Sequence, residues 1–155
     1  MSLFFADGSP FVTGFQSNVY YEPTAQERKA RLILHVTIEG IMTQAMVDTG
    51  GLYLFCSPSV ARLLALDEAE ALGAQTIIFR EERVRGSLHR LTLTLLAEEG
   101  DDLRIDTTAF VPAEDDEDIP EFPCILGLYG CLERVRFAFD PLTDTFYFGP
   151  ASDSA

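Results

Sequence analysis

The chain has 155 residues, of which 47% are hydrophobic, and a formal net charge of −14 at pH 7. This length and apolar content suit one domain with a real core, whereas so acidic a surface disfavours nucleic acid and anionic membranes. The sequence has no apolar run near the ~20 residues of a membrane span and no signal-peptide pattern at its start, so it predicts a cytoplasmic protein.

Residues 1–30 form an irregular first segment, because glycines and prolines interrupt it. Its aromatic and aliphatic residues are too numerous for a disordered tail. We therefore expect an extension that packs on the domain or on a dimer partner, as an edge strand or a partner contact. The charged stretch 25–31 suggests a helical turn or a linker.

From Arg31 the apolar residues recur at every second position and predict a half-buried strand with one apolar face: Leu32, Leu34, Val36 and Ile38. Glu39 and Gly40 suit a hairpin turn. The return strand, 41–47, is apolar and ends at Asp48.

A helix should follow at Ser57 and Pro58, because serine caps free amides and proline suits the first helical position. It could extend to Leu72, where Gly73 would stop it. Segments 76–79 and 83–87 predict a hairpin with a charged tip, and 91–95 and 103–111 alternate as further strands.

The acidic segment 113–123 contains Pro120 and Pro123 and lacks the ligand spacing of a calcium loop, so we expect a solvated loop. A short helix at 128–134 and strands at 135–139 and 146–148 complete the chain. Mostly short strands with one or two short helices predict an all-β fold built as a closed or partly closed barrel.

No cofactor or metal site is expected. The chain has no glycine-rich phosphate loop, and the spacing of its cysteines fits no zinc pattern. Cys56, Cys124 and Cys131 lie in apolar sequence, which indicates reduced, buried thiols.

The tripeptide Asp48-Thr49-Gly50 is the strongest candidate for chemistry. An acidic residue at the end of an apolar strand is costly to place, and such groups are often kept for catalysis. The simpler interpretation of Asp48 is a turn aspartate that accepts backbone amides. For Asp140 this interpretation is stronger, because Asp140-Pro141 begins a turn and needs no chemistry.

Three blocks together resemble the retropepsin-like aspartic proteases, the single-lobe relatives of pepsin. They are the hairpin that ends in Val47-Asp48-Thr49-Gly50, a charged hairpin at the place of the family's flap, and Ile125-Leu126-Gly127 followed by a short helix and a hairpin. The resemblance covers roughly residues 31–149 and leaves 150–155 as a short tail. It implies a single-lobe, acid-protease-like closed β-barrel.

The resemblance also implies an endopeptidase that hydrolyses peptides or proteins. Because the chain has one Asp-Thr-Gly, the two carboxylates of the family's reaction would come from Asp48 of each subunit of a homodimer. Thr49 would bond across the two-fold axis, and Gly50 would allow close approach of the two backbones. The residues implied to bind substrate are Gly51, Ile78, Phe79, Arg80, Ile125, Leu126 and Gly127.

Two features depart from the family pattern. Gly51 stands where the family usually has Ala or Ser, and the hairpin tip is charged rather than glycine-rich. An inactive peptide-binding or scaffold module is therefore an alternative, as is a monomeric structural β-domain. A Ser-His-Asp triad that uses Ser57, Ser59 or Ser87 is less favoured, because no serine lies in a Gly-x-Ser-x-Gly turn.

Overall fold

The computed structural model describes residues 3–17, 19–23, 28–79, 81–113 and 122–151, and for 19–23 and 28–31 it describes the backbone alone. The strands are β1 (Gly14–Ser17), β2 (Val19–Pro23), β3 (Arg28–Ile38), β4 (Ile41–Val47), β5 (Leu54–Phe55), β6 (Gly73–Phe79), β7 (Glu82–Leu95), β8 (Glu99–Gly100), β9 (Leu103–Pro112), β10 (Cys124–Leu126), β11 (Val135–Asp140) and β12 (Thr145–Pro150). The helical elements are α1 (Pro58–Leu64) and the 3-10 helices η1 (Glu68–Glu70) and η2 (Leu132–Arg134).

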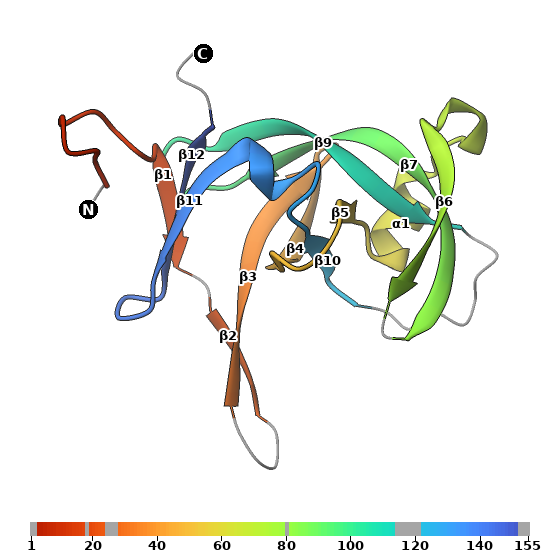
Figure 1. Cartoon of the computed structure of the whole chain (residues 1–155), viewed down its shortest axis with the longest axis horizontal. Coiled ribbons are helices and arrows are strands. Elements are labelled where there is room, and N and C mark those ends of the chain that lie inside the picture. The colour runs from red at the N-terminus through yellow and green to blue at the C-terminus, as the bar shows by residue number, and fades with distance from the viewer. Residues whose placement is uncertain (1–2, 18, 24–27, 80, 114–121, 152–155) are drawn as a thin grey trace.

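In the described part of the chain, six strands close into a barrel. The ring runs β3, β4, β10, β5, β9, β7 and returns to β3 through antiparallel pairing of Val36–Ile38 with Leu93–Leu95. This confirms the predicted all-β closed barrel. Figure 1 shows the β6–β7 hairpin at one end of the molecule and the strands β1, β11 and β12 at the other.

Every barrel strand contributes apolar side chains to one core. The predicted alternating face of β3 is confirmed, because Leu34, Val36 and Ile38 have no exposed surface. The β3–β4 turn is also as predicted, since both Glu39 and Gly40 have positive φ, as a tight hairpin turn of the I′ type requires. β4 therefore pairs with β3 directly after this turn and ends immediately before Asp48.

A buried glutamine joins the smaller sheet, with strand order β11-β12-β1-β8, to the barrel. Gln16 is 1% exposed, and its side-chain amide donates to the carbonyl oxygens of His35 (3.0 Å) and Leu96 (2.6 Å). Its oxygen accepts from the amide of His35 at 2.8 Å. In the strand orders of the described sheets, β1 is an inner strand, whereas β2 lies at one edge of the larger sheet and β6 at the other.

Several predicted boundaries are wrong. Residues 28–31 belong to β3 rather than to a helical turn or linker, because they pair with β2; residues 24–27 lie outside the described part. The strand predicted at 91–95 is one continuous strand, β7, with the hairpin strand before it. The helix expected at 128–134 is a single 3-10 turn, η2.

The helix α1 begins as predicted and ends early. Ser57 caps it by accepting the amide of Val60, and Pro58 is its first residue. Ala65 then turns left-handed, with φ of 47°, and donates to the carbonyl of Ala61, which ends the helix at Leu64. Gly73 begins β6 instead of stopping a helix. Among the described residues, no helix has the length and apolar content to cross a bilayer.

Candidate active site

Asp48 lies at the end of β4 in a tight turn that its own side chain closes. Its Oδ1 accepts the amide of Gly50 at 3.0 Å, and its carbonyl accepts the amide of Gly51 at 3.0 Å. The Asp48 amide donates to the carbonyl of Leu126 at 3.0 Å. Asp48, Thr49 and Gly50 are all exposed in the single chain. The turn therefore presents a carboxylate to solvent from the end of a paired strand.

The strand β10 supports the Asp48 turn through backbone hydrogen bonds. It lies between β4 and β5, the two strands that the Asp48 turn connects, and pairs parallel with β4 and antiparallel with β5. Beyond β10, Gly127 donates to the carbonyl of Tyr53 at 2.8 Å, and Leu128 donates to the carbonyl of Gly51 at 2.9 Å. The two segments therefore brace each other through backbone bonds on both sides of Asp48.

The close approach of these segments requires glycine at position 127. A Cβ there would lie 2.5 Å from the carbonyl oxygen of Tyr53 and 2.7 Å from the carbonyl carbons of Gly51 and Leu52. At Gly51 itself a Cβ would meet nothing closer than 3.4 Å. An alanine at position 51 would therefore fit this chain.

Ile125, Leu126 and Gly127 are buried, and Leu126 has no exposed surface. In the single chain they support the Asp48 turn instead of lining an open surface. Substrate contact by these three residues stays a prediction.

The β6–β7 hairpin is anchored to the body by side chains of the segment that follows Asp48. The hydroxyl of Tyr53 donates to Oε1 of Gln75 on β6 at 3.1 Å. Near the hairpin end, the ring of Phe79 lies 5.0 Å from that of Phe55 and 4.7 Å from that of Phe122, between centroids. With Phe110 these rings form an aromatic cluster.

The predicted hairpin residues differ in their surroundings. Ile78 is 76% exposed, whereas Phe79 is half-buried in the aromatic cluster. Arg80 lies outside the described residues, as does most of the acidic segment 113–123. Among the described residues of the charged tip, Glu81 lies in the turn with a φ of 68°, and Glu82 is exposed.

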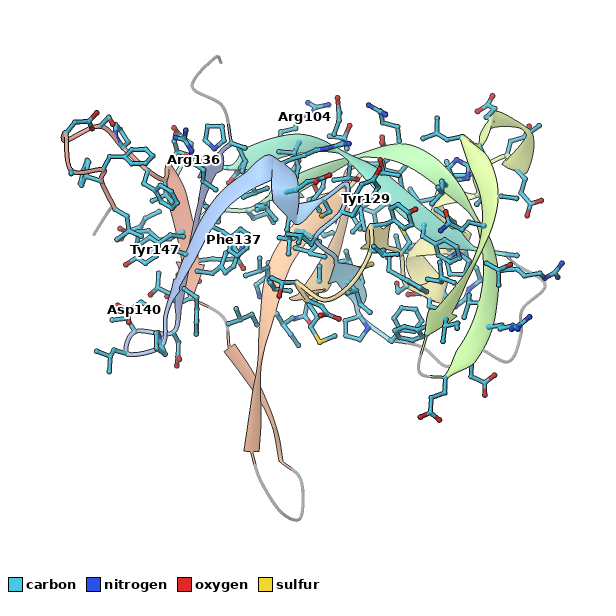
Figure 2. All side chains as sticks on the ribbon, in the orientation of Figure 1. Arg104, Tyr129, Arg136, Phe137, Asp140 and Tyr147 are labelled. Carbon is cyan, nitrogen blue, oxygen red and sulfur yellow. The ribbon has the colours of Figure 1, made fainter. Side chains whose placement is uncertain are left out.

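Exposed apolar side chains flank the Asp48 turn, and sequence patterning did not single them out. Leu52, Leu128 and Tyr129 are 53%, 44% and 57% exposed, and Leu52 bridges to Tyr129 through the backbone. Figure 2 shows Tyr129 near the middle of the molecule. The only sequence signal for them was their position just after Asp48-Thr49-Gly50 and Gly127.

The cysteines behave as predicted. All three are reduced thiols and are buried, and burial raises the pKa of Cys56 well above its ordinary value and that of Cys131 to about 12. Such thiols are poor nucleophiles at neutral pH. The described residues contain no group of three or more His, Cys, Asp or Glu side chains placed to hold a metal ion.

Comparison with known proteins supports the architecture. A solved structure, that of a retropepsin-like aspartic protease from Rickettsia conorii, aligns with 87% of this chain and 95% of its own, with a TM-score of 0.53 and 17% identity. The chain has the retropepsin fold. No protein-family model matches it, and no curated protein does. At this identity the likeness extends to the fold alone, so the chemistry must be argued from the Asp48 turn.

Proposed function

We propose that this chain is an aspartic endopeptidase that acts as a symmetric homodimer. Asp48 of each subunit would meet at the two-fold axis. Two carboxylates about 3 Å apart cannot both ionise easily, so they share one proton. The ionised carboxylate takes a proton from the attacking water while the protonated one donates to the scissile carbonyl.

The observation that carries this proposal is the bracing of an exposed Asp48 by β10 and Gly127. A simple turn aspartate needs no such support, since backbone amides alone satisfy it. Here the strand before Asp48, the strand after it and β10 are hydrogen-bonded together. Catalytic groups benefit from such rigid support, because small misplacement is costly to the rate.

The exposed apolar residues beside the turn support the dimer. Leu52, Leu128 and Tyr129 surround the same backbone that presents Asp48. An isologous contact would cover these side chains and bring two copies of the turn together. Thr49 would then hydrogen-bond across the axis, and Gly50 would permit the close approach.

The β6–β7 hairpin would serve as the flap over an extended peptide. Ile78, Phe79 and Arg80 would then face the substrate, with Gly51 and Ile125–Gly127 below it. Because the ring of Phe79 packs on Phe55 and Phe122, opening this hairpin would separate those rings.

The test is cleavage of a mixed peptide library between pH 3 and pH 8, read by mass spectrometry. The Asp48→Asn variant should lose all cleavage, and sedimentation should show that it remains dimeric. Asp140→Asn is the matched control. Its carboxylate accepts the amide of Leu142 at 2.9 Å, in the same two-residue turn that Asp48 makes with Gly50, and Figure 2 shows it at the β11–β12 turn.

Wild-type and Asp140→Asn protein should give the same fragments, with a maximum on the acid side of neutrality because one carboxyl must stay protonated. Equal cleavage by Asp48→Asn would refute the proposal. Saturable peptide binding with no product at any pH, from dimeric protein, would instead support the peptide-binding module. A strict monomer at micromolar concentration would exclude the two-carboxylate site.

A further inference from the structure

A cavity of about 780 Å³ lies beside the β6–β7 hairpin. Its walls come from α1, from η1 and the residues around it, from the first half of β6, from β7 and from the end of β9. Along β7, Val84 and Leu88 face the aromatic cluster, whereas Ser87 and His89 line the cavity. No residue of the Asp48 turn contributes to it. Its size is within the range of about 300–1,000 Å³ typical of small-molecule sites.

Beside the cavity, polar side chains replace the apolar ones along one face of β7. Leu91, Leu93 and Leu95 are buried in the barrel core. The same alternation continues toward the cavity with His89 and Ser87, which are 6% and 7% exposed. A buried polar pair costs stability unless its hydrogen bonds are made, so its presence here calls for an explanation.

One hydrogen bond joins Ser87 and His89, and it leaves other donor and acceptor positions of the two side chains unused. Oγ of Ser87 lies 2.8 Å from Nε2 of His89. The other ring nitrogen, Nδ1, has no hydrogen-bond partner within the described residues. In one tautomer the pair keeps an unused Nδ1–H donor and the lone pairs of Ser87. In the other tautomer it keeps the Ser87 hydroxyl donor and an Nδ1 acceptor. Either way, the pair offers one donor and one acceptor.

The electrostatics of the cavity favour an uncharged occupant. Burial lowers the pKa of His89, an effect that the charges of Glu68 and Glu70 oppose only in part, so the imidazole is neutral at neutral pH. The rim carries one carboxylate, Glu68, and one guanidinium, Arg85, which already makes an interaction of its own. An ion entering the cavity would lose its hydration without finding an unmatched opposite charge.

We infer that this cavity is a second ligand site, separate from the Asp48 turn, for a small uncharged molecule whose amide or similar group both donates and accepts a hydrogen bond. Ser87 and His89 would bind that group together. The small side chains of Ala61, Ala65 and Ala74 around them leave room for the rest of the molecule. The inference goes beyond the proposed peptidase and does not depend on it.

The test is an NMR titration of the full chain with benzamide and with benzoate, which have the same shape and differ in charge. Benzamide should shift the signals of Ser87, His89 and Gly73–Thr76 saturably, and benzoate should not. Ser87→Ala should weaken benzamide binding by up to about tenfold, as loss of one hydrogen bond predicts. Asp48→Asn should bind benzamide as the wild type does.

A second variant guards against misfolding of the first. Ala74 is exposed at the cavity wall, so Ala74→Phe should fill the cavity and block benzamide without touching the buried pair. The inference is overturned if benzamide gives no saturable shift, if benzoate shifts the same signals equally, or if binding is undiminished in both Ser87→Ala and Ala74→Phe.

Discussion

Substitution of Gly127 by alanine tests whether close backbone packing supports the Asp48 turn. The added Cβ would lie 2.5 Å from the carbonyl oxygen of Tyr53, about 0.5 Å inside the 3.0 Å limit of real Cβ contacts. All three of its nearest neighbours are backbone atoms of residues 51–53, which cannot rotate away as a flexible side chain would. The segment carrying the turn must therefore move.

Overpacking of this kind costs about 1–3 kcal/mol, and we expect a value near the top of that range, since the same shift strains the Gly127–Tyr53 hydrogen bond of 2.8 Å. For a chain of this size each kcal/mol lowers the melting temperature by about 2–4 °C. Gly127→Ala should thus melt about 6–12 °C below the wild type. Peptide cleavage should fall even at temperatures where the variant is folded, because Asp48 moves with its support.

Gly51→Ala is the matched control on the facing segment. Its Cβ would meet the carbonyl oxygen of Asp48 at 3.4 Å and the Cα of Gly127 at 3.5 Å, both ordinary contacts. We expect its free energy of unfolding to stay within about 0.5 kcal/mol of the wild type. Thermal and urea denaturation followed by circular dichroism would measure both variants. A Gly127→Ala protein that melts with the wild type, or a Gly51→Ala protein that falls as far, would refute the packing argument.

Three further predictions concern other parts of the molecule. Gln16→Ala should lower the free energy of unfolding by about 2–4 kcal/mol in urea titrations, because the amide of His35 and the carbonyl of Leu96 lose their side-chain partner and the carbonyl of His35 keeps only the Leu96 amide, at 3.4 Å. A loss below about 1 kcal/mol would contradict this. Phe79→Ala should raise the rate of amide exchange in β6 about tenfold, or about 1.4 kcal/mol, because two ring contacts are lost. Exchange rates in β3 and β4 should stay the same, and a uniform rise across the barrel would be inconsistent with local anchoring. Because burial lowers the pKa of His89 below 6.5, the unfolded chain takes up a proton first as pH falls through that value. The wild type should therefore lose stability relative to His89→Gln between about pH 7.5 and about pH 5, and a constant difference in melting temperature would show that burial does not matter.

Local patterns predicted the elements that depend on neighbouring residues. Alternation in β3 and β9 assigned the faces that are buried, and Glu39-Gly40 located the turn between β3 and β4. The Ser57 cap likewise located the start of α1. Its end was misplaced because Ala65 adopts a left-handed conformation that glycine or asparagine usually signals.

Long-range contacts were not predictable in the same way. Gln16 looks like any polar residue in a strand, yet it bonds to residues 19 and 80 positions away. The Tyr53–Gln75 bond joins residues 22 positions apart, and nothing near either residue in sequence indicates it. These contacts depend on which strands become neighbours when the barrel closes, and that is a property of the whole sheet.

The sequence by itself determined the all-β character of this protein, the hairpin that delivers Asp48 and the burial of its cysteines, because each follows from short-range alternation, turn chemistry and apolar context. Only the tertiary structure decided what surrounds Asp48. Insertion of β10 between β4 and β5 brings Gly127 against residues 51–53. The same barrel closure places the polar end of β7 beside α1, where Ser87 and His89 meet a cavity instead of the core.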